Sequence, residues 1–294
     1  MKRATMEAHA KINLTLDVTG KRPNGYHDVC MVMQSIGVHD DVTVITGMGG
    51  ERIALRIEGS DLPVDHSNIA YRAAELFYEE TGLPCEGILI IIEKHIPVAA
   101  GLAGGSTDAA AVLVLLDSLY ETNLGTQKLM EMGLKLGADV PFCIFGGTML
   151  AQGIGEKLTR LTNAPQTYIV LCKPPIYVST PAIYKAIDSA EIITHPQTNE
   201  MISAIDAGDI SAVSQYLCNV MQPVTAGMHP EVTEICDTML RHGAMGAIMS
   251  GSGPSTFGLF TTKEQAQSAC EELAKTYAET FLTDFSSAAQ IKHI

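Results

Sequence analysis

The sequence predicts an α+β protein with two domains. In the first half, a strand-like alternation over residues 8–18 is followed by an apolar β-type run over 87–92, which leads through a glycine-rich loop into an apolar helix-type run over 109–120. In the second half, strand-like and amphipathic helical runs follow the order β-α-α-β-α-β, which is typical of a small α+β sandwich. The chain of 294 residues is long enough for two domains. The pattern changes near residues 153–161, so we divide the chain into residues 1–160 and 161–294.

Composition limits the partners of this chain. Hydrophobic residues make up 46% of it, which is ample for a sizeable core. The formal net charge of −14 argues against non-specific binding of nucleic acid or of an anionic membrane surface. An anionic ligand would therefore need local basic groups, and the candidates are Lys11, Lys21, Arg22 and Lys94.

The cysteines and the N-terminal residues indicate a cytoplasmic protein. Seven cysteines occur without any C-x-x-C spacing, which suggests reduced thiols instead of a zinc site or a disulfide framework. The first ten residues have no apolar signal region, and no apolar stretch approaches the length of a membrane span.

The first strand, residues 8–18, carries alternating apolar and polar side chains. Lys11 and Asn13 fall on its polar side, and for an isolated strand the favoured interpretation of Lys11 is a solvated outer face. In the loop that follows, Pro-Asn-Gly precedes Tyr26 and His27. These two rings could offer a stacking surface and a hydrogen-bonding edge, or they could pack on the next strand as an ordinary turn.

Further elements follow up to the middle of the chain. Residues 29–38, 41–46 and 53–57 are predicted strands, with a hairpin-type turn at 47–50. Residues 68–79 have helical spacing, with Ser67 or Asn68 as the cap.

The glycine-rich loop suggests an anion site. Residues 98–105 are only Gly, Ala, Val and Leu, so backbone N–H groups can approach a ligand closely. Ser106, Thr107 and Asp108 are predicted to cap the helix that follows, whose N-terminus favours phosphate. The alternative is a turn that allows tight strand–helix packing. The loop is not a Walker A loop, because Gly105 stands where that motif needs lysine, nor does it read G-x-G-x-x-G.

Asp139 is a carboxylate among apolar neighbours. It follows a predicted helix over residues 127–137 and precedes Pro141 in G-A-D-V-P-F. From the residues alone, a helix N-cap or a turn aspartate is slightly favoured over a functional role.

The second half continues with a strand over residues 167–172 and helices over 199–207, 209–220 and 230–242. A second glycine loop, residues 250–255, joins two strand-like runs. Thr261 and Glu264 are predicted to form a capping box for a helix ending near residue 278, before a closing strand over 281–285.

Three patterns in register resemble the galactokinase–homoserine kinase–mevalonate kinase–phosphomevalonate kinase (GHMP) superfamily. They are A-K-I-N-L near the start, P-x-x-x-G-L-A-G-G-S-T-D-A-A in the middle and M-S-G-S-G-P-S-T-F-G near the end. Within the superfamily, A-K-I-N-L together with R-P-N-G-Y-H-D, G-A-D-V-P-F and S-T-P-A-I-Y is most similar to the kinases of a cytidine-diphosphate-linked methylerythritol in the non-mevalonate isoprenoid pathway.

The resemblance implies the two-domain GHMP kinase fold, with a ribosomal-protein-S5-like N-terminal domain that binds ATP and a ferredoxin-like C-terminal domain on the substrate side. It implies transfer of the ATP γ-phosphoryl group to the C2 hydroxyl of that small-molecule substrate. We expect Mg²⁺ from the charge of ATP, although no ligand for the metal is assigned. We expect a monomer or homodimer.

The resemblance also implies roles for particular residues. Lys11 and Asp139 match the catalytic pair. Asn13, Tyr26, His27, Asp139, Thr180 and Tyr184 would bind the substrate, with the two tyrosines on either side of the cytosine and His27 at its polar edge. The ATP-binding residues would be Asn68, Lys94, Pro97, Gly101, Leu102, Ala103, Gly104, Gly105, Ser106 and Thr107, with Asn68 and Lys94 beside the adenosine.

Two other functions stay open. A mevalonate-type, homoserine or sugar kinase would use the same loops, but R-P-N-G-Y-H and Tyr184 count against it. An ATP-binding regulatory module without catalysis would need neither Lys11 nor Asp139.

Overall fold

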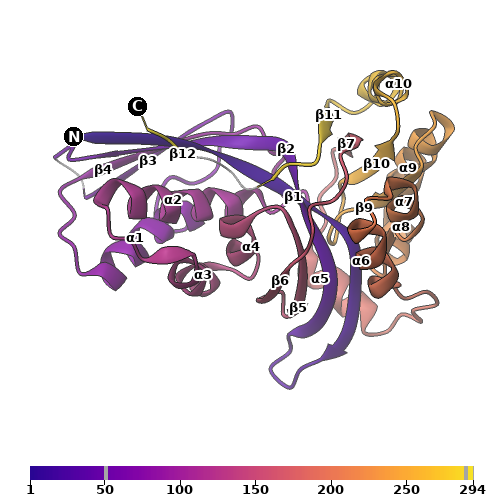
Figure 1. The fold of residues 1–294 in the computed structure, drawn as a ribbon, viewed down its shortest axis with the longest axis horizontal. Helices are drawn as coiled ribbons and strands as arrows, with labels where there is room; N and C mark the ends of the chain where they lie inside the picture. Colours follow the sequence, from indigo (N-terminus) through magenta and orange to yellow (C-terminus); the bar gives the residue numbers. More distant parts are fainter. Residues whose placement is uncertain (50–51, 288–290, 294) are drawn as a thin grey trace.

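Two β-sheets organise the chain in the computed structural model, which describes residues 1–49, 52–287 and 291–293 (Figure 1). Each sheet lies in one of two lobes, and the long strands β1 (Lys2–Lys21) and β2 (His27–Thr46) extend from one lobe towards the other. Gly50 of the predicted hairpin turn lies outside the described residues.

The first sheet has the order β12-β1-β2-β4-β3. Two further strands, β5 and β6, extend it from β2, and the short β8 pairs in parallel with β1. The remaining bounds are β3 (Ile53–Glu58), β4 (Ile88–Glu93), β5 (Thr148–Gly153), β6 (Lys157–Arg160), β8 (Cys218–Asn219) and β12 (Ile291–His293). Because β12 pairs antiparallel with β1, the end of the chain returns to the first sheet. The division at residue 160 stays a prediction.

The prediction of separate strands at residues 29–38 and 41–46 is wrong, because β2 is continuous. The predicted break fell at His39 and Asp40, and the Asp40 side chain is fully buried. In the structure, Asp40 stays inside the strand because it accepts hydrogen bonds from the backbone N–H groups of His95 and Ile96 and pairs with Lys94.

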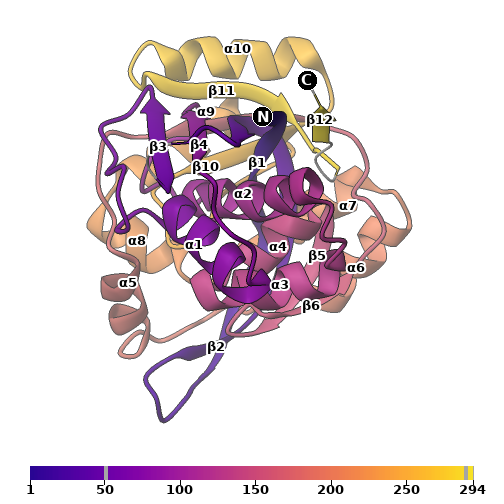
Figure 2. The ribbon, with the colours of Figure 1, turned by 90° about the vertical axis from the view of Figure 1, so that its left-hand side faces the viewer.

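Four helices cover one face of the first sheet (Figure 2). They are α1 (Ile69–Thr81), α2 (Gly104–Tyr120), α3 (Gly125–Leu136) and α4 (Val140–Phe145). The predicted cap of α1 is confirmed, because the Asn68 side chain accepts a hydrogen bond from Ala70 N. The apolar run of α2 is buried along most of its length between the sheet and its neighbouring helices, which explains why it is apolar all round.

The second sheet has the order β11-β7-β10-β9, and all its neighbouring strands are antiparallel. Its strands are β7 (Tyr168–Lys173), β9 (Gly246–Met249), β10 (Thr256–Phe260) and β11 (Glu279–Asp284). Two helices, α9 (Glu231–Arg241) and α10 (Lys263–Ala274), pack on one face through Ile235, Met239 and Ala266. Numbered along the chain, the four strands follow the order 4-1-3-2, which confirms the expected ferredoxin-like arrangement.

The other helices of this lobe are α5 (Thr180–Ile187), α6 (Thr198–Asp206), α7 (Ile210–Gln215) and α8 (Gln222–Met228). The predicted helix over residues 209–220 is too long, because Cys218 and Asn219 leave the helix to pair with β1. The predicted capping box is displaced by one residue, since Thr262, in extended conformation, accepts the hydrogen bond from Gln265 N.

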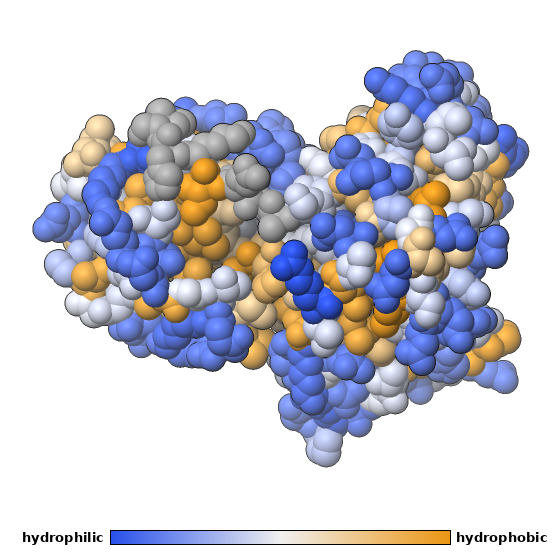
Figure 3. All heavy atoms as spheres, in the orientation of Figure 1, coloured by the Kyte–Doolittle hydropathy of each residue, from blue (hydrophilic) through white to orange (hydrophobic). Residues whose placement is uncertain are grey.

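Most of the surface in the view of Figure 3 is hydrophilic, and apolar residues show mainly away from the rim of each lobe. In the described part of the chain, no helix combines the length and the apolar composition that a membrane span requires.

Candidate active site

A cavity of about 830 Å³ is lined by residues from both halves of the chain. Ten of the predicted site residues line it: Lys11, Asn13, Tyr26, His27, Gly101, Ala103, Ser106, Asp139, Thr180 and Tyr184. The predicted residues that do not line it are Asn68, Lys94, Pro97, Leu102, Gly104, Gly105 and Thr107.

The two glycine loops contact each other at this cavity. Ser250 Oγ donates a hydrogen bond of 3.2 Å to the Gly101 carbonyl oxygen. A Cβ at Gly101 would lie 2.5 Å from the Ser250 carbonyl oxygen, so only glycine allows this approach. The second loop is held in turn by Asn219, whose side-chain amide donates to the carbonyl oxygens of Met249 and Gly251.

The N-terminus of α2 has no side-chain cap, so the predicted capping by Ser106, Thr107 and Asp108 is wrong. Gly101 and Ala103 both have left-handed backbone conformations, with φ of 74° and 60°, and these turn the chain so that the helix begins at Gly104. The three polar residues therefore lie inside the helix. Thr107 donates its hydroxyl to the His9 carbonyl oxygen and is buried. An uncapped helix N-terminus presents unpaired N–H groups and a partial positive charge, which suit an anion.

Lys11 is buried, with 5% of its surface exposed, so its placement on a solvated face is wrong. Ala10, Ile12 and Leu14 pack together in an apolar cluster, so the alternation holds here, and Lys11 is buried because the other face of β1 is covered as well. The backbone N–H of Lys11 donates to the Leu102 carbonyl oxygen of the first glycine loop. Its ammonium donates to Asn13 Oδ1 at 2.8 Å and lies 4.0 Å from Asp139 Oδ2.

Asp139 occupies the N-cap position of α4, but its side chain makes no capping hydrogen bond. One third of that side chain is exposed, in the cavity wall that also holds Lys11. The carboxylate is therefore available to a ligand and is paired only loosely with the ammonium.

Aromatic side chains form a corner of the cavity wall. The His27 ring stacks on the Tyr184 ring with centroids 4.8 Å apart, and His27 Nε2 lies 2.7 Å from Asp188 Oδ1. Burial raises the pKa of Tyr184 to about 12, so its hydroxyl stays protonated. Tyr26 is 60% exposed beside this pair. The prediction placed Tyr26 and Tyr184 on opposite sides of one base, whereas in the structure it is His27 that stacks on Tyr184.

Of the four basic candidates for an anionic ligand, three are engaged by carboxylates. Lys21 pairs with Asp188 at 2.5 Å, and Arg22 pairs with Asp28 at 2.7 Å. Lys94 is buried between Asp40 and Asp108. Lys11 is therefore the one of the four whose ammonium faces the cavity without a carboxylate in hydrogen-bonding contact.

Asn68 also has its polar atoms engaged. Its amide donates to the Pro63 carbonyl oxygen, and its oxygen caps α1.

Two family models match this chain. GHMP kinases N terminal domain covers residues 68–147, and GHMP kinases C terminal covers residues 201–279. The 4-diphosphocytidyl-2-C-methyl-D-erythritol kinase of Caldicellulosiruptor bescii is 45% identical over 278 residues, which are 95% of this chain and 96% of the relative. The kinase of the same name from Clostridioides difficile is 44% identical and covers 96% of this chain and 95% of its own length. The chain belongs to the 4-diphosphocytidyl-2-C-methyl-D-erythritol kinase family of GHMP kinases.

Solved structures agree with this assignment. A crystal structure of 4-(cytidine 5'-diphospho)-2C-methyl-D-erythritol kinase matches this GHMP kinase with a TM-score of 0.81 and 32% identity, over 96% of this chain and 99% of the other. A homoserine kinase from Cytophaga hutchinsonii, at 18% identity and a TM-score of 0.77 over 99% and 98% of the two chains, shares the fold.

Sequence reasoning missed several residues that build the site of this GHMP kinase. Asn219 supports the second glycine loop, and Asp188 holds both His27 and Lys21. Ser252 lines the cavity and lies 2.7 Å from the Thr180 hydroxyl. Ser252 belongs to the third superfamily motif and could have been found there, whereas Asp188 and Asn219 stand outside the motifs.

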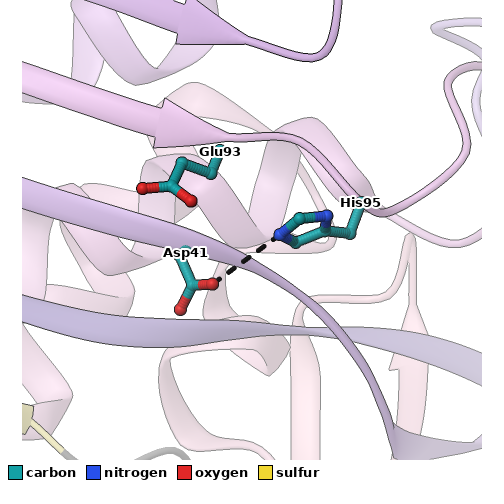
Figure 4. A group of neighbouring side chains, drawn as sticks. All are labelled: Asp41, Glu93 and His95. Carbon is teal, nitrogen blue, oxygen red and sulfur yellow. Dashed lines mark ion pairs between the residues drawn. The ribbon is translucent and has the colours of Figure 1, made fainter.

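A second group of titratable side chains lies on β2, at the end of β4 and on the loop that follows β4, and none of them lines the cavity (Figure 4). The ligand atoms of Asp41, Glu93 and His95 lie within 4.8 Å of one another, and His95 Nε2 is 3.7 Å from Asp41 Oδ2. This grouping could hold a metal ion, but its side chains are largely exposed and it has no part in the site described above.

Proposed function

We propose that this GHMP kinase transfers the γ-phosphoryl group of ATP to the C2 hydroxyl of 4-diphosphocytidyl-2-C-methyl-D-erythritol. The observation that carries the proposal is the meeting of Lys11 and Asp139 in one cavity, between an uncapped helix N-terminus and an aromatic corner. Phosphoryl transfer requires a site for the phosphates, a group that receives the proton of the alcohol and a means of holding the acceptor in line.

The phosphate end is supported by the first turn of α2. No side chain caps the N–H groups of Gly104, Gly105 and Ser106. Ser106 also lines the cavity. We place the ATP phosphates against this turn, where backbone donors offset the negative charge of the protein as a whole. Mg²⁺, when bound, would neutralise charge on the triphosphate. Hydroxyl oxygens suit this metal, and Ser106 is the residue of the cavity wall, in the first turn of α2, that would hold it.

The reacting end is supported by Asp139 and Lys11. A tertiary alcohol is a poor nucleophile, and its proton must leave as the new O–P bond forms. Asp139 can accept that proton as general base once the hydroxyl lies within hydrogen-bonding distance. The Lys11 ammonium would stabilise charge that develops on the transferred phosphoryl oxygens.

The cytidine end is supported by Tyr26, His27 and Tyr184. Stacking on an aromatic ring is tolerant of base identity, so a polar group must select cytosine. His27 is suited to this because Asp188 and Tyr184 fix its ring. Asn13 and Thr180 also line the cavity, and they would contact the methylerythritol part.

The proposal is tested by measuring ADP formation with the cytidine-linked substrate and, in parallel, with mevalonate and with homoserine. We expect turnover of the first and none of the other two. Turnover of mevalonate or homoserine alone would show a different kinase of the same superfamily. ATP binding without turnover of any acceptor would show a regulatory module. The cytoplasmic location and the monomeric or dimeric state stay predictions.

A further inference from the structure

Three charged side chains are buried together beside the phosphate-binding turn. The side chains of Asp40, Lys94 and Asp108 are 0%, 4% and 5% exposed. Lys94 Nζ contacts Asp40 Oδ2 and lies 2.8 Å from Asp108 Oδ2. Removing charges from water costs free energy, and apolar residues of similar volume would serve stability equally well or better. A buried group of this kind is therefore better explained by the geometry that it fixes.

The group ties together both ends of the first glycine loop. At the entry, Asp40 Oδ1 accepts hydrogen bonds from the backbone N–H groups of His95 and Ile96, at 2.6 and 2.8 Å. At the exit, Asp108 lies near the start of α2 and is held by Lys94. Asp40 on β2 is thus connected directly to the beginning of the loop and, through Lys94, to its end.

The ammonium of Lys94 lies close to the first residue of α2. A Cβ placed on Gly104 would be 3.4 Å from Lys94 Nζ and 3.1 Å from Ile96 Cγ2. Lys94 does not line the cavity. These positions put the amine against the base of the helical turn that presents its N–H groups to phosphate, and they leave it with two carboxylates as partners.

The charge balance of the group depends on Lys94. Asp108 Oδ1 is buried and has no hydrogen-bond partner among the described residues. Without the ammonium, Asp40 and Asp108 could not both stay ionised in the space between β2 and α2 without repelling each other, and the unbalanced pair would displace the first turn of the helix.

We propose that Asp40, Lys94 and Asp108 position the phosphate-binding turn, and that Lys94 acts through this turn on the triphosphate instead of contacting the nucleoside. The inference rests on the proposed function, because it assumes that ATP phosphates bind at the start of α2. Lys94 is in this view a positioning residue, which replaces the expected place of Lys94 beside the adenosine.

The test compares two fragments of ATP. Inorganic tripolyphosphate and adenosine each compete with a fluorescent ATP analogue for the wild-type protein and for Lys94→Met. We expect Lys94→Met to weaken the affinity for tripolyphosphate at least tenfold. The affinity for adenosine should stay within twofold of the wild-type value. The KM for the cytidine-linked substrate, measured at saturating ATP, should also stay within twofold. The proposal would be overturned if Lys94→Met lowered only the affinity for adenosine, lowered both affinities equally or lowered neither.

A second variant tests the charge balance. Asp108→Asn removes one carboxylate without changing the volume of the side chain. The double variant Lys94→Met with Asp108→Asn should therefore bind tripolyphosphate at least threefold more tightly than Lys94→Met alone. A double variant no better than Lys94→Met would contradict the repulsion between Asp40 and Asp108. As a matched control, Lys128→Met removes another paired lysine, whose partner is Glu80. It should change the affinity for neither tripolyphosphate nor adenosine.

These outcomes are distinct from a failure of the proposed function. A wild-type protein that binds neither ATP nor tripolyphosphate would refute the proposed function itself. Wild-type binding of both, with the wrong pattern in the variants, would refute only the positioning role of Lys94.

Discussion

Lys11 Nζ lies 4.0 Å from Asp139 Oδ2, a separation that leaves the carboxylate associated with the ammonium but not locked to it. The hydrogen bond of the ammonium goes to Asn13, which holds the amine in place while Asp139 stays one third exposed. A closer ion pair would keep the carboxylate from the acceptor hydroxyl. The observed spacing therefore suits a base that must exchange one partner for another during the reaction.

Gly101→Ala should disrupt the contact between the two glycine loops. The new Cβ would lie 2.5 Å from the Ser250 carbonyl oxygen, and φ of 74° is unfavourable for alanine. We expect a loss of about 1–3 kcal/mol in the free energy of unfolding. We also expect a KM for ATP raised at least tenfold, measured by steady-state kinetics alongside urea denaturation.

The matched control for this variant is Ala103→Gly in the same loop. Ala103 already has a left-handed φ of 60°, which glycine adopts without strain. This substitution should leave stability within about 1 kcal/mol of wild type. Equal damage from both substitutions would show that the loop tolerates no change of any kind, and the argument from the Ser250 contact would fail.

Tyr26→Ala should raise the KM for the cytidine-linked substrate and spare the KM for ATP. Stacking of a base on an aromatic ring contributes about 1–3 kcal/mol, so we expect this KM to rise about 5- to 150-fold. Tyr177 is 74% exposed and does not line the cavity, so Tyr177→Ala serves as the control and should change neither constant. An equal rise of both KM values in Tyr26→Ala would place this ring elsewhere.

Asp108 should make stability depend on pH. Burial raises the pKa of Asp108 to about 7, with Lys94 opposing this shift and Asp40 reinforcing it. In the unfolded chain the carboxyl titrates near its ordinary value, about 3.9. Between these two values the native state keeps a proton that the unfolded state releases, so this group's contribution to stability is present at low pH and is lost as pH rises towards 7. The free energy of unfolding of Asp108→Asn, measured relative to that of wild type at the same pH, should therefore rise by on the order of 2–4 kcal/mol between pH 4.5 and pH 7.5.

Urea denaturation at several pH values measures this difference. Asp65→Asn gives the control of opposite sign, because hydrogen bonds from Ser67 lower the pKa of Asp65. That carboxylate contributes stability above its ordinary pKa and loses the contribution as pH falls. A flat difference for Asp108→Asn, or one that falls with rising pH, would contradict the assignment of a protonated Asp108 at low pH.

Local patterns in the sequence predicted most of the elements. Alternation located the first strand, the lack of bulky side chains in 98–105 located a loop that lines the cavity, and Asn68 was correctly expected at a helix start. These features depend on neighbours in the chain, so a single sequence reveals them. The resemblance to GHMP kinases added the expected pairing of Lys11 with Asp139, and the two residues lie in one cavity.

Other features depend on contacts that no local pattern records. Both faces of β1 are covered around Lys11, and strand alternation alone cannot distinguish a covered polar face from the solvated face that it favoured for this residue. The helix α2 begins at Gly104 because Ala103 adopts a conformation that is rare for alanine. Lys94 was expected beside a nucleoside, yet its two carboxylate partners come from positions 40 and 108.

The most direct test of the account is the rate of phosphoryl transfer in a single turnover by Asp139→Asn, with ATP and the cytidine-linked substrate both bound. Asparagine keeps the shape of the side chain but cannot accept the proton of the C2 hydroxyl. We expect the transfer rate to fall by about 10²-fold or more, while the dissociation constants of both ligands stay within a few-fold of wild type. A variant that transfers the phosphoryl group at the wild-type rate would show that Asp139 is not the base, and the central role of the Lys11–Asp139 pair would be refuted.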